Sequence, residues 1–159
     1  GAYGVKPLAL EYFCRNFERL PENVRSGLSV ENDDKESLYS TLELYEGVYK
    51  RIGIPIVFDY HHHRFCTGGQ SEGEALQLAA STWHGVTPVV HLSESRREEQ
   101  RDNKIKEQAH SDYIYKPVDN YGVKYDMMLE CKKKELALLN YRSILKTGEQ
   151  NGTKEKACC

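Results

Sequence analysis

The sequence predicts an α/β fold built from TIM-barrel-like (β/α) repeats. Apolar segments of strand length alternate along the chain with segments whose apolar residues follow helical spacing. This alternation is typical of parallel strands joined by crossover helices. Neither a GxGxxG nor a GxxxxGK[ST] motif follows a predicted strand, which argues against a Rossmann or P-loop fold. A complete barrel takes about 250 residues. The 159 residues of this chain therefore predict only part of one.

The first third of the chain predicts two helices separated by a strand. After Pro7, apolar residues recur at steps of three and four, the spacing of one helical face, and Pro21 ends this helix. Residues 28–31 form a short apolar strand segment that leads into an acidic cluster. A second helical face over residues 38–52 stops at Gly53.

The middle of the chain repeats the order of strand and helix. Residues 54–59 are rich in β-branched and aromatic side chains and predict a buried strand. Ser71 and Glu74 form a capping-box pattern for a third helix, which Gly85 closes. Residues 88–92 are a further apolar segment of strand length.

The last third of the chain contains longer polar segments. Residues 93–109 carry many charges of both signs and predict a loop or a solvated helix. Residues 111–115 and 125–130 are strand candidates, and residues 132–145 predict the last helix.

Composition limits the possible classes of function. One domain, the partial barrel, is predicted for residues 1–147, and a polar, mobile tail for residues 148–159. The net charge is -2, from 22 basic and 24 acidic residues, so a nucleic-acid partner requires a local basic patch. No apolar run approaches about 18 residues and the N-terminus lacks a secretory pattern, so no membrane association is predicted.

Cysteine usage and the first residue give two further expectations. The five cysteines are an odd number and contain no CxxC pair, which predicts a reduced protein in the cytoplasm or nucleus. The chain begins with Gly1 rather than Met, which predicts a processed or incomplete chain.

Side chains that commonly bind metals stand at or near the ends of the predicted strands. They are Glu31, Asp59, His91 and Glu130. The separations of 28, 32 and 39 residues (59 minus 31, 91 minus 59 and 130 minus 91) are close to the length of one βα unit. Each unit is therefore expected to bring one such side chain to the same rim, where barrels of this type keep their chemistry.

Carboxylates and imidazoles that meet at one rim would repel each other unless a cation lay among them. Oxygen and nitrogen ligands without a thiolate fit Mn²⁺, Mg²⁺ or Zn²⁺, and the share of carboxylates favours Mn²⁺. One or two rings of the triplet 61–63 are expected to face the rim and the others solvent or a neighbouring loop. His110 is a further candidate, whereas His84 is expected to be structural.

Two charged clusters flank these residues. At least two of Asn32, Asp33 and Asp34 are expected to cap the next helix or to hold turn geometry. Lys132, Lys133 and Lys134 follow the rim, where they could contact phosphates, although such runs are more often a solvated face.

Five sequence blocks resemble the successive motifs of the UV damage endonucleases. They are ENDD at residues 31–34, FDYHHH at 58–63, HLS at 91–93, HSDY at 110–113 and LECKKKE at 129–135. Their order and spacing match over roughly residues 1–145. This resemblance implies the later part of a TIM barrel from a repair nuclease that nicks DNA 5′ of ultraviolet photoproducts and some other lesions.

The resemblance also implies roles for individual residues. It implies a manganese cluster, with these ligands: Glu31, Asp59, His62, His91, His110 and Glu130. Among them, Glu31, Asp59 and Glu130 are expected to be catalytic through two-metal chemistry. The implied partner is damaged double-stranded DNA, and we expect it to be contacted by Lys132, Lys133, Lys134, Arg96 and Arg97.

One family position differs in this chain, and two alternative functions stay open. The family commonly has a modified, metal-bridging lysine two residues before the histidine equivalent to His91, and here that residue is Val89. The first alternative is another metal-dependent barrel enzyme, of the apurinic-site endonuclease or sugar isomerase type. The second is a non-catalytic barrel fragment that binds DNA or a subunit, such as the missing N-terminal part of the barrel.

Overall fold

The chain forms two compact units in a computed structural model that describes residues 4–155 and the side chains of residues 4–147. The first unit contains the residues up to His91 together with Asn120–Met128. The second contains Leu92–Asp119 together with the residues from Leu129 onward. Among the helices of the described part, none combines the length and the apolar character needed to span a membrane.

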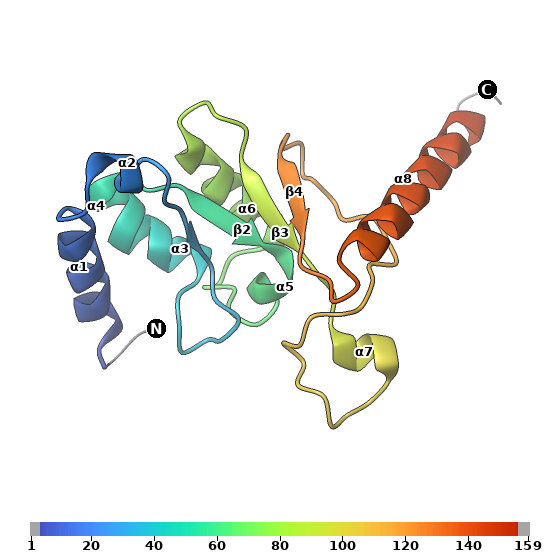
Figure 1. The fold of residues 1–159 in the computed structure, drawn as a ribbon, viewed down its shortest axis with the longest axis horizontal. Coiled ribbons are helices and arrows are strands. Elements are labelled where there is room, and N and C mark those ends of the chain that lie inside the picture. The colour runs from blue at the N-terminus through green and yellow to red at the C-terminus, as the bar shows by residue number, and fades with distance from the viewer. Residues whose placement is uncertain (1–3, 156–159) are drawn as a thin grey trace. The chain divides into compact units, whose positions relative to one another are not determined.

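Four short strands form one sheet in the order β1-β2-β3-β4 (Figure 1). Their bounds are Val30–Glu31 for β1, Ile56–Asp59 for β2, Val89–Leu92 for β3 and Asp126–Leu129 for β4. β1 and β2 are parallel, as are β2 and β3. Asp126 N donates to Pro88 O and Glu130 N donates to Leu92 O, so β4 runs in the same direction as β3. The predicted parallel α/β arrangement is confirmed.

The core of the first unit lies around β2, whose four residues are all buried. α3 (Thr41–Leu44) and α6 (Glu72–Ala80) pack against β2 and against each other. Thr82 Oγ1 accepts a hydrogen bond from Ile56 N at 2.9 Å, and Trp83 Nε1 donates to Ile56 O at 2.8 Å. These bonds fix the segment after α6 to the first residue of β2.

The predicted helix starts are largely confirmed. α1 covers Lys6–Phe17 and is followed by the short α2 (Glu22–Arg25). The capping box of Ser71 and Glu74 is present at the start of α6, which continues as η2 (Ser81–Trp83). A second capping box joins Ser40 and Glu43, so α3 begins at Thr41 rather than near residue 38. The pattern S-x-x-E at residues 40–43 could have identified it.

The predicted helix over residues 38–52 has an irregular centre. α3 is followed by the π-helical turn η1 (Tyr45–Tyr49) and by α4 (Lys50–Ile52), which ends at Gly53 with a φ of 67°. A Cβ on Gly47 would lie 2.5 Å from Leu10 Cδ1. Glycine therefore allows α1 to pack directly against this turn, and π-turns are sites of such local adjustment.

Two predictions about the last third differ from the structure. The sequence predicts a strand at residues 111–115, and this is wrong: they form an irregular segment after α7 (Arg96–Gln100). α8 covers Glu135–Glu155, whereas the sequence predicts a helix over residues 132–145. It begins later because Lys134 has a left-handed φ of 46°. It also includes residues 148–155 of the predicted tail, while residues 156–159 lie outside the described residues.

Candidate metal centre

Three predicted ligands of the first unit meet at the C-terminal ends of its strands. Glu31 ends β1, Asp59 ends β2 and is fully buried, and His91 pairs with Asp59 in the sheet register. One ligand atom from each of these three residues lies within 4.8 Å of the others. Two carboxylates and an imidazole at this separation fit a divalent cation, which would offset the repulsion between the acids.

Asn32 joins the ends of β1 and β2. Its Nδ2 donates to Asp59 O at 3.1 Å, and its Oδ1 accepts from Asp59 N at 2.8 Å. The Asn32 side chain is fully buried, so both bonds are shielded from water. Asp33 Oδ2 accepts from Tyr39 N at 3.2 Å and holds the following loop, as the sequence predicts. Asn32 instead positions a predicted metal ligand, which the sequence does not indicate.

His62 lies next to this cluster, and a backbone carbonyl orients its ring. Asp59 is the N-cap of α5 (Tyr60–His63), and its Oδ1 accepts from His62 N at 2.8 Å. His62 Nδ1 lies 2.9 Å from Asn32 O and 3.8 Å from Glu31 Oε1. A carbonyl oxygen can only accept, so Nδ1 is the donor and Nε2 is the nitrogen left for a metal. Metal-binding histidines are commonly oriented in this way.

Glu31 and His91 form a close pair inside the cluster. His91 Nδ1 lies 2.7 Å from Glu31 Oε1. Burial raises the pKa of Glu31, but the hydrogen bond from His91 and the charges of His91 and His62 outweigh it, so the pKa lies below its usual value. Glu31 therefore stays charged at neutral pH, as a metal ligand must.

The other two rings of the histidine triplet are buried beside aromatic side chains. His61 and His63 are buried, although the sequence predicts that the rings away from the rim face solvent or a loop. The ring of His61 packs edge-on against Phe65, and that of His63 lies 5.3 Å from Phe58. Burial lowers the pKa of His63. The tight turn of α5 sends consecutive side chains in different directions, which leaves His62 beside Glu31.

His110 and Glu130 lie together in the second unit. His110 Nδ1 lies 3.1 Å from Glu130 O and 3.5 Å from Glu130 Oε2. The carbonyl again makes Nδ1 the donor, so Nε2 is the nitrogen left for a metal, as in His62. His84 has the predicted structural role, because its Nε2 donates to Gly53 O at 3.0 Å.

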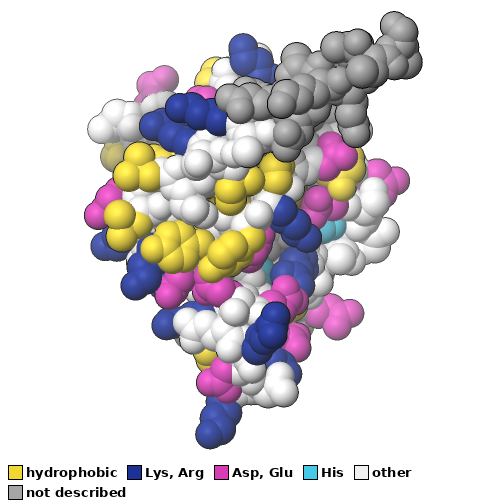
Figure 2. Space-filling view, turned by 90° about the vertical axis from the view of Figure 1, so that its right-hand side faces the viewer, with side chains coloured by type: hydrophobic (Ala, Val, Ile, Leu, Met, Phe, Trp, Pro, Cys, Tyr) yellow, Lys and Arg dark blue, Asp and Glu magenta, His cyan; other side chains and the backbone are white. Residues whose placement is uncertain are grey.

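The residues predicted to contact DNA lie in the second unit. Lys132, Lys133 and Lys134 are exposed in the turn before α8. Arg97 forms an ion pair with Glu107, with 2.6 Å between Nη1 and Oε1, and the Nε of Arg96 is buried. On the face in Figure 2, basic side chains alternate with acidic ones around a band of hydrophobic side chains. The lysines are therefore better placed for phosphate contacts than either arginine.

Val89 lies on the same face of the sheet as His91. Both residues belong to β3, and side chains two positions apart on a strand point to the same face. Val89 is half-buried, and Val90 on the opposite face is buried. A longer side chain at position 89 would thus start on the face that carries His91.

Comparisons with known proteins identify the family of this chain. The model of the family UV-endonuclease UvdE matches residues 1–155. The UV DNA damage endonuclease of Bacillus mycoides (strain KBAB4) is 37% identical over 149 residues, which is 87% of this chain and 44% of that protein. The enzyme of the same name from Bacillus cereus (strain G9842) is 36% identical over 148 residues, with the same coverage of 87% and 44%.

The fold is also similar to a solved structure. The crystal structure of SacUVDE superimposes with a TM-score of 0.76 at 32% identity, covering 91% of this chain and 48% of that chain. The chain thus spans less than half the length of these relatives. The likeness confirms the predicted fold, a part of a TIM-barrel-like structure. Together with the family match, it shows that the chain belongs to the UV-endonuclease UvdE family.

Proposed function

We propose that this chain forms the metal-binding part of a DNA repair endonuclease that nicks the backbone 5′ of ultraviolet photoproducts and other lesions. The observation that carries the proposal is the cluster of Glu31, Asp59 and His91 at the strand ends of a UV-endonuclease family member. Damaged double-stranded DNA is the proposed substrate. The three described cysteines, Cys14, Cys66 and Cys131, are buried free thiols, which supports a reducing, intracellular compartment.

We assign the ion as Mn²⁺, with Mg²⁺ and Zn²⁺ as alternatives, from the chemistry of the donor set. Glu31, Asp59 and His91 would hold it, and we propose His62, His110 and Glu130 as further ligands. Glu31, Asp59 and Glu130 are the proposed catalytic carboxylates. A divalent ion supplies an activated water and neutralises charge on the phosphate. The chain's own part is to orient the imidazoles through carbonyl bonds and to hold Asp59 through Asn32.

A nicking assay tests this function. Duplexes with photoproducts, with abasic sites and without damage are incubated with Mn²⁺ and the chain, alone and together with the unmatched part of the Bacillus mycoides relative. We expect nicks 5′ of photoproducts in the combined sample. Cleavage confined to abasic duplex would favour the apurinic-site endonuclease alternative. Binding without cleavage in every sample would favour the non-catalytic fragment.

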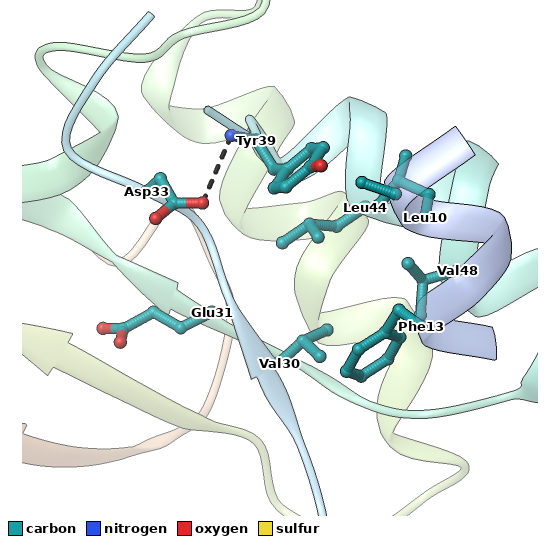
Figure 3. Close-up of a pocket in the computed structure, with 9 residues that line it drawn as sticks. Leu10, Phe13, Val30, Glu31, Asp33, Tyr39, Leu44 and Val48 are labelled. Carbon is teal, nitrogen blue, oxygen red and sulfur yellow. Dashed lines mark hydrogen bonds between the residues drawn. The ribbon is translucent and has the colours of Figure 1, made fainter. Parts of the chain in front are cut away.

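An apolar cavity beside β1 supports the remaining part of the barrel as a partner (Figure 3). The cavity has a volume of about 280 Å³ and lies between α1, β1 and the helix after it. Val30 points toward Phe13 and Val48, whereas Glu31 points the other way (Figure 3). β1 is an edge strand of the sheet formed by the described residues, and α1 exposes Leu8 and Tyr12. An added strand and helix would cover these surfaces.

Phe13→Ser should weaken association with the unmatched part of the Bacillus mycoides relative, because Phe13 lines the cavity and is 39% exposed. Calorimetric titration of the two polypeptides measures the affinity. Leu20→Ser is the control, since Leu20 is similarly exposed at 38% and does not line the cavity. Equal affinities of the two variants would contradict the proposed docking surface.

DNA binding should fall steeply with salt. Each phosphate neutralised by a lysine or arginine contributes a slope of about 0.9 in log K against log salt. Replacing Lys132, Lys133 and Lys134 with glutamine should lower this slope more than Arg97→Gln, because Arg97 is already paired with Glu107. Fluorescence anisotropy at several salt concentrations gives the slopes. An affinity insensitive to salt, or to the lysine changes, would remove these residues from the interface.

Val89→Lys should raise the number of Mn²⁺ ions bound per chain. The new amine would start on the face of His91, where the family commonly has a modified, bridging lysine. An unmodified lysine would instead repel cations, so the modification state is measured by mass spectrometry. If the lysine at position 89 is modified and the number of bound Mn²⁺ ions does not change, then this position is not a metal-ligand position that the valine has left empty.

A further inference from the structure

We propose that Glu99 of α7 is a positioning residue for His110. Its carboxylate holds the His110 loop, residues 110–115, in the shape that sets the direction of the His110 imidazole. This inference rests on the proposed role of His110 as a ligand. All the contacts that carry it lie within the second unit.

The Glu99 carboxylate binds three groups of the His110 loop. Oε2 accepts from Asp112 N at 2.7 Å, and Oε1 accepts from Tyr113 N at 2.9 Å. Oε1 also accepts from the Tyr115 hydroxyl at 2.9 Å. Two consecutive backbone amides thus bond to one side chain rather than to a neighbouring strand. Hydrogen bonds to an ionised acceptor are roughly twice as strong as neutral ones, so they can hold this irregular backbone.

Ser111, the residue before these two amides, is held by hydrogen bonds to Glu94. Ser111 is fully buried, and its N donates to Glu94 O at 2.8 Å. Its hydroxyl donates to Tyr113 O at 2.7 Å and accepts from Glu94 N at 3.1 Å. Glu94 Oε1 further accepts from Tyr115 N at 3.4 Å. The backbone is therefore held on both sides immediately after His110.

A bond to the backbone of Glu130 then helps to orient the ring of His110. Nδ1 donates to Glu130 O, so the direction of Nε2 depends on where the loop places the Cα of His110. Glutamine at position 99 could accept from one amide, but its NH₂ group would face the other N–H. The loop would lose one of its charge-assisted bonds and would open near Asp112 or Tyr113.

Calorimetric Mn²⁺ titration of the chain tests this inference. Glu99→Gln should weaken Mn²⁺ binding about tenfold, the scale expected for groups that orient a metal ligand. Glu98→Gln, the same change at an exposed neighbour on α7, is the control and should leave the affinity unchanged. In the background of His110→Ala, Glu99→Gln should cause no additional loss. A merely structural role would not give this dependence on His110.

The outcomes separate this inference from the proposed function. If His110→Ala leaves Mn²⁺ affinity unchanged, the role of His110 as a ligand fails. If His110→Ala weakens binding but Glu99→Gln does not, or if the two losses add, the positioning role is overturned. Should Glu99→Gln fail to fold, Tyr115→Phe removes a single bond to Glu99. Hydrogen exchange at the Asp112 and Tyr113 amides should then be faster than in the unaltered chain, and unchanged exchange would contradict the role of Glu99.

Discussion

Replacing Asn32 with leucine should lower the free energy of unfolding by about 2 to 6 kcal/mol, which is the largest stability effect that we expect here. The Asn32 amide donates to Asp59 O and accepts from Asp59 N, and the side chain is fully buried. Leucine has a similar volume but can do neither. A buried polar group that loses its partner costs about 1 to 3 kcal/mol, and two such groups are affected.

Urea denaturation of the chain measures this loss. The control is Asn23→Leu, the same chemical change at an exposed position in α2, where we expect an effect within about 0.5 kcal/mol. The Asn32 variant should also bind Mn²⁺ more weakly, because the backbone of Asp59 loses its link to β1. Similar stabilities of the two variants would show that the Asn32 bonds do not hold the strand ends together.

The strand ends were predictable because they follow from local pattern and chain geometry. A buried parallel strand reads as a continuous apolar run, as at residues 56–58, and the βα spacing then places the acids at one edge. The same reasoning located Glu31, Asp59 and His91, whose ligand atoms do lie together. Capping boxes are equally local, since both partners stand three residues apart.

Residues 111–115 show why other features were not predictable. Their apolar and aromatic side chains resemble a strand, but the backbone amides of Asp112 and Tyr113 bond to the carboxylate of Glu99, which is more than ten residues away. No pattern within the segment reveals such a partner. The directions in which the side chains of residues 61–63 point could not be predicted either. They depend on the short helix α5, whose N-cap, Asp59, is itself a predicted ligand.

Replacing Asp59 with asparagine should weaken Mn²⁺ binding by at least about tenfold. Altering a group that only orients a metal ligand already weakens binding by about this factor, and Asp59 is itself a proposed ligand. The substitution removes one negative charge from the cluster and leaves Glu31 and His91 in place. Asparagine keeps the Oδ1 acceptor and is a good N-cap, so the bond from His62 N and the start of α5 should survive.

The stability of the metal-free chain should change in the opposite sense. Asp59 is fully buried, and its ligand oxygen lies within 4.8 Å of that of Glu31, so ionising both carboxyl groups is unfavourable without a cation. Asp59→Asn should therefore unfold at an equal or higher urea concentration without Mn²⁺ and gain less stability when Mn²⁺ is added. Asp126→Asn, at the exposed start of β4, is the control with the same change of charge. A loss of stability without Mn²⁺, together with unchanged Mn²⁺ affinity, would mean that Asp59 is a structural N-cap rather than a metal ligand.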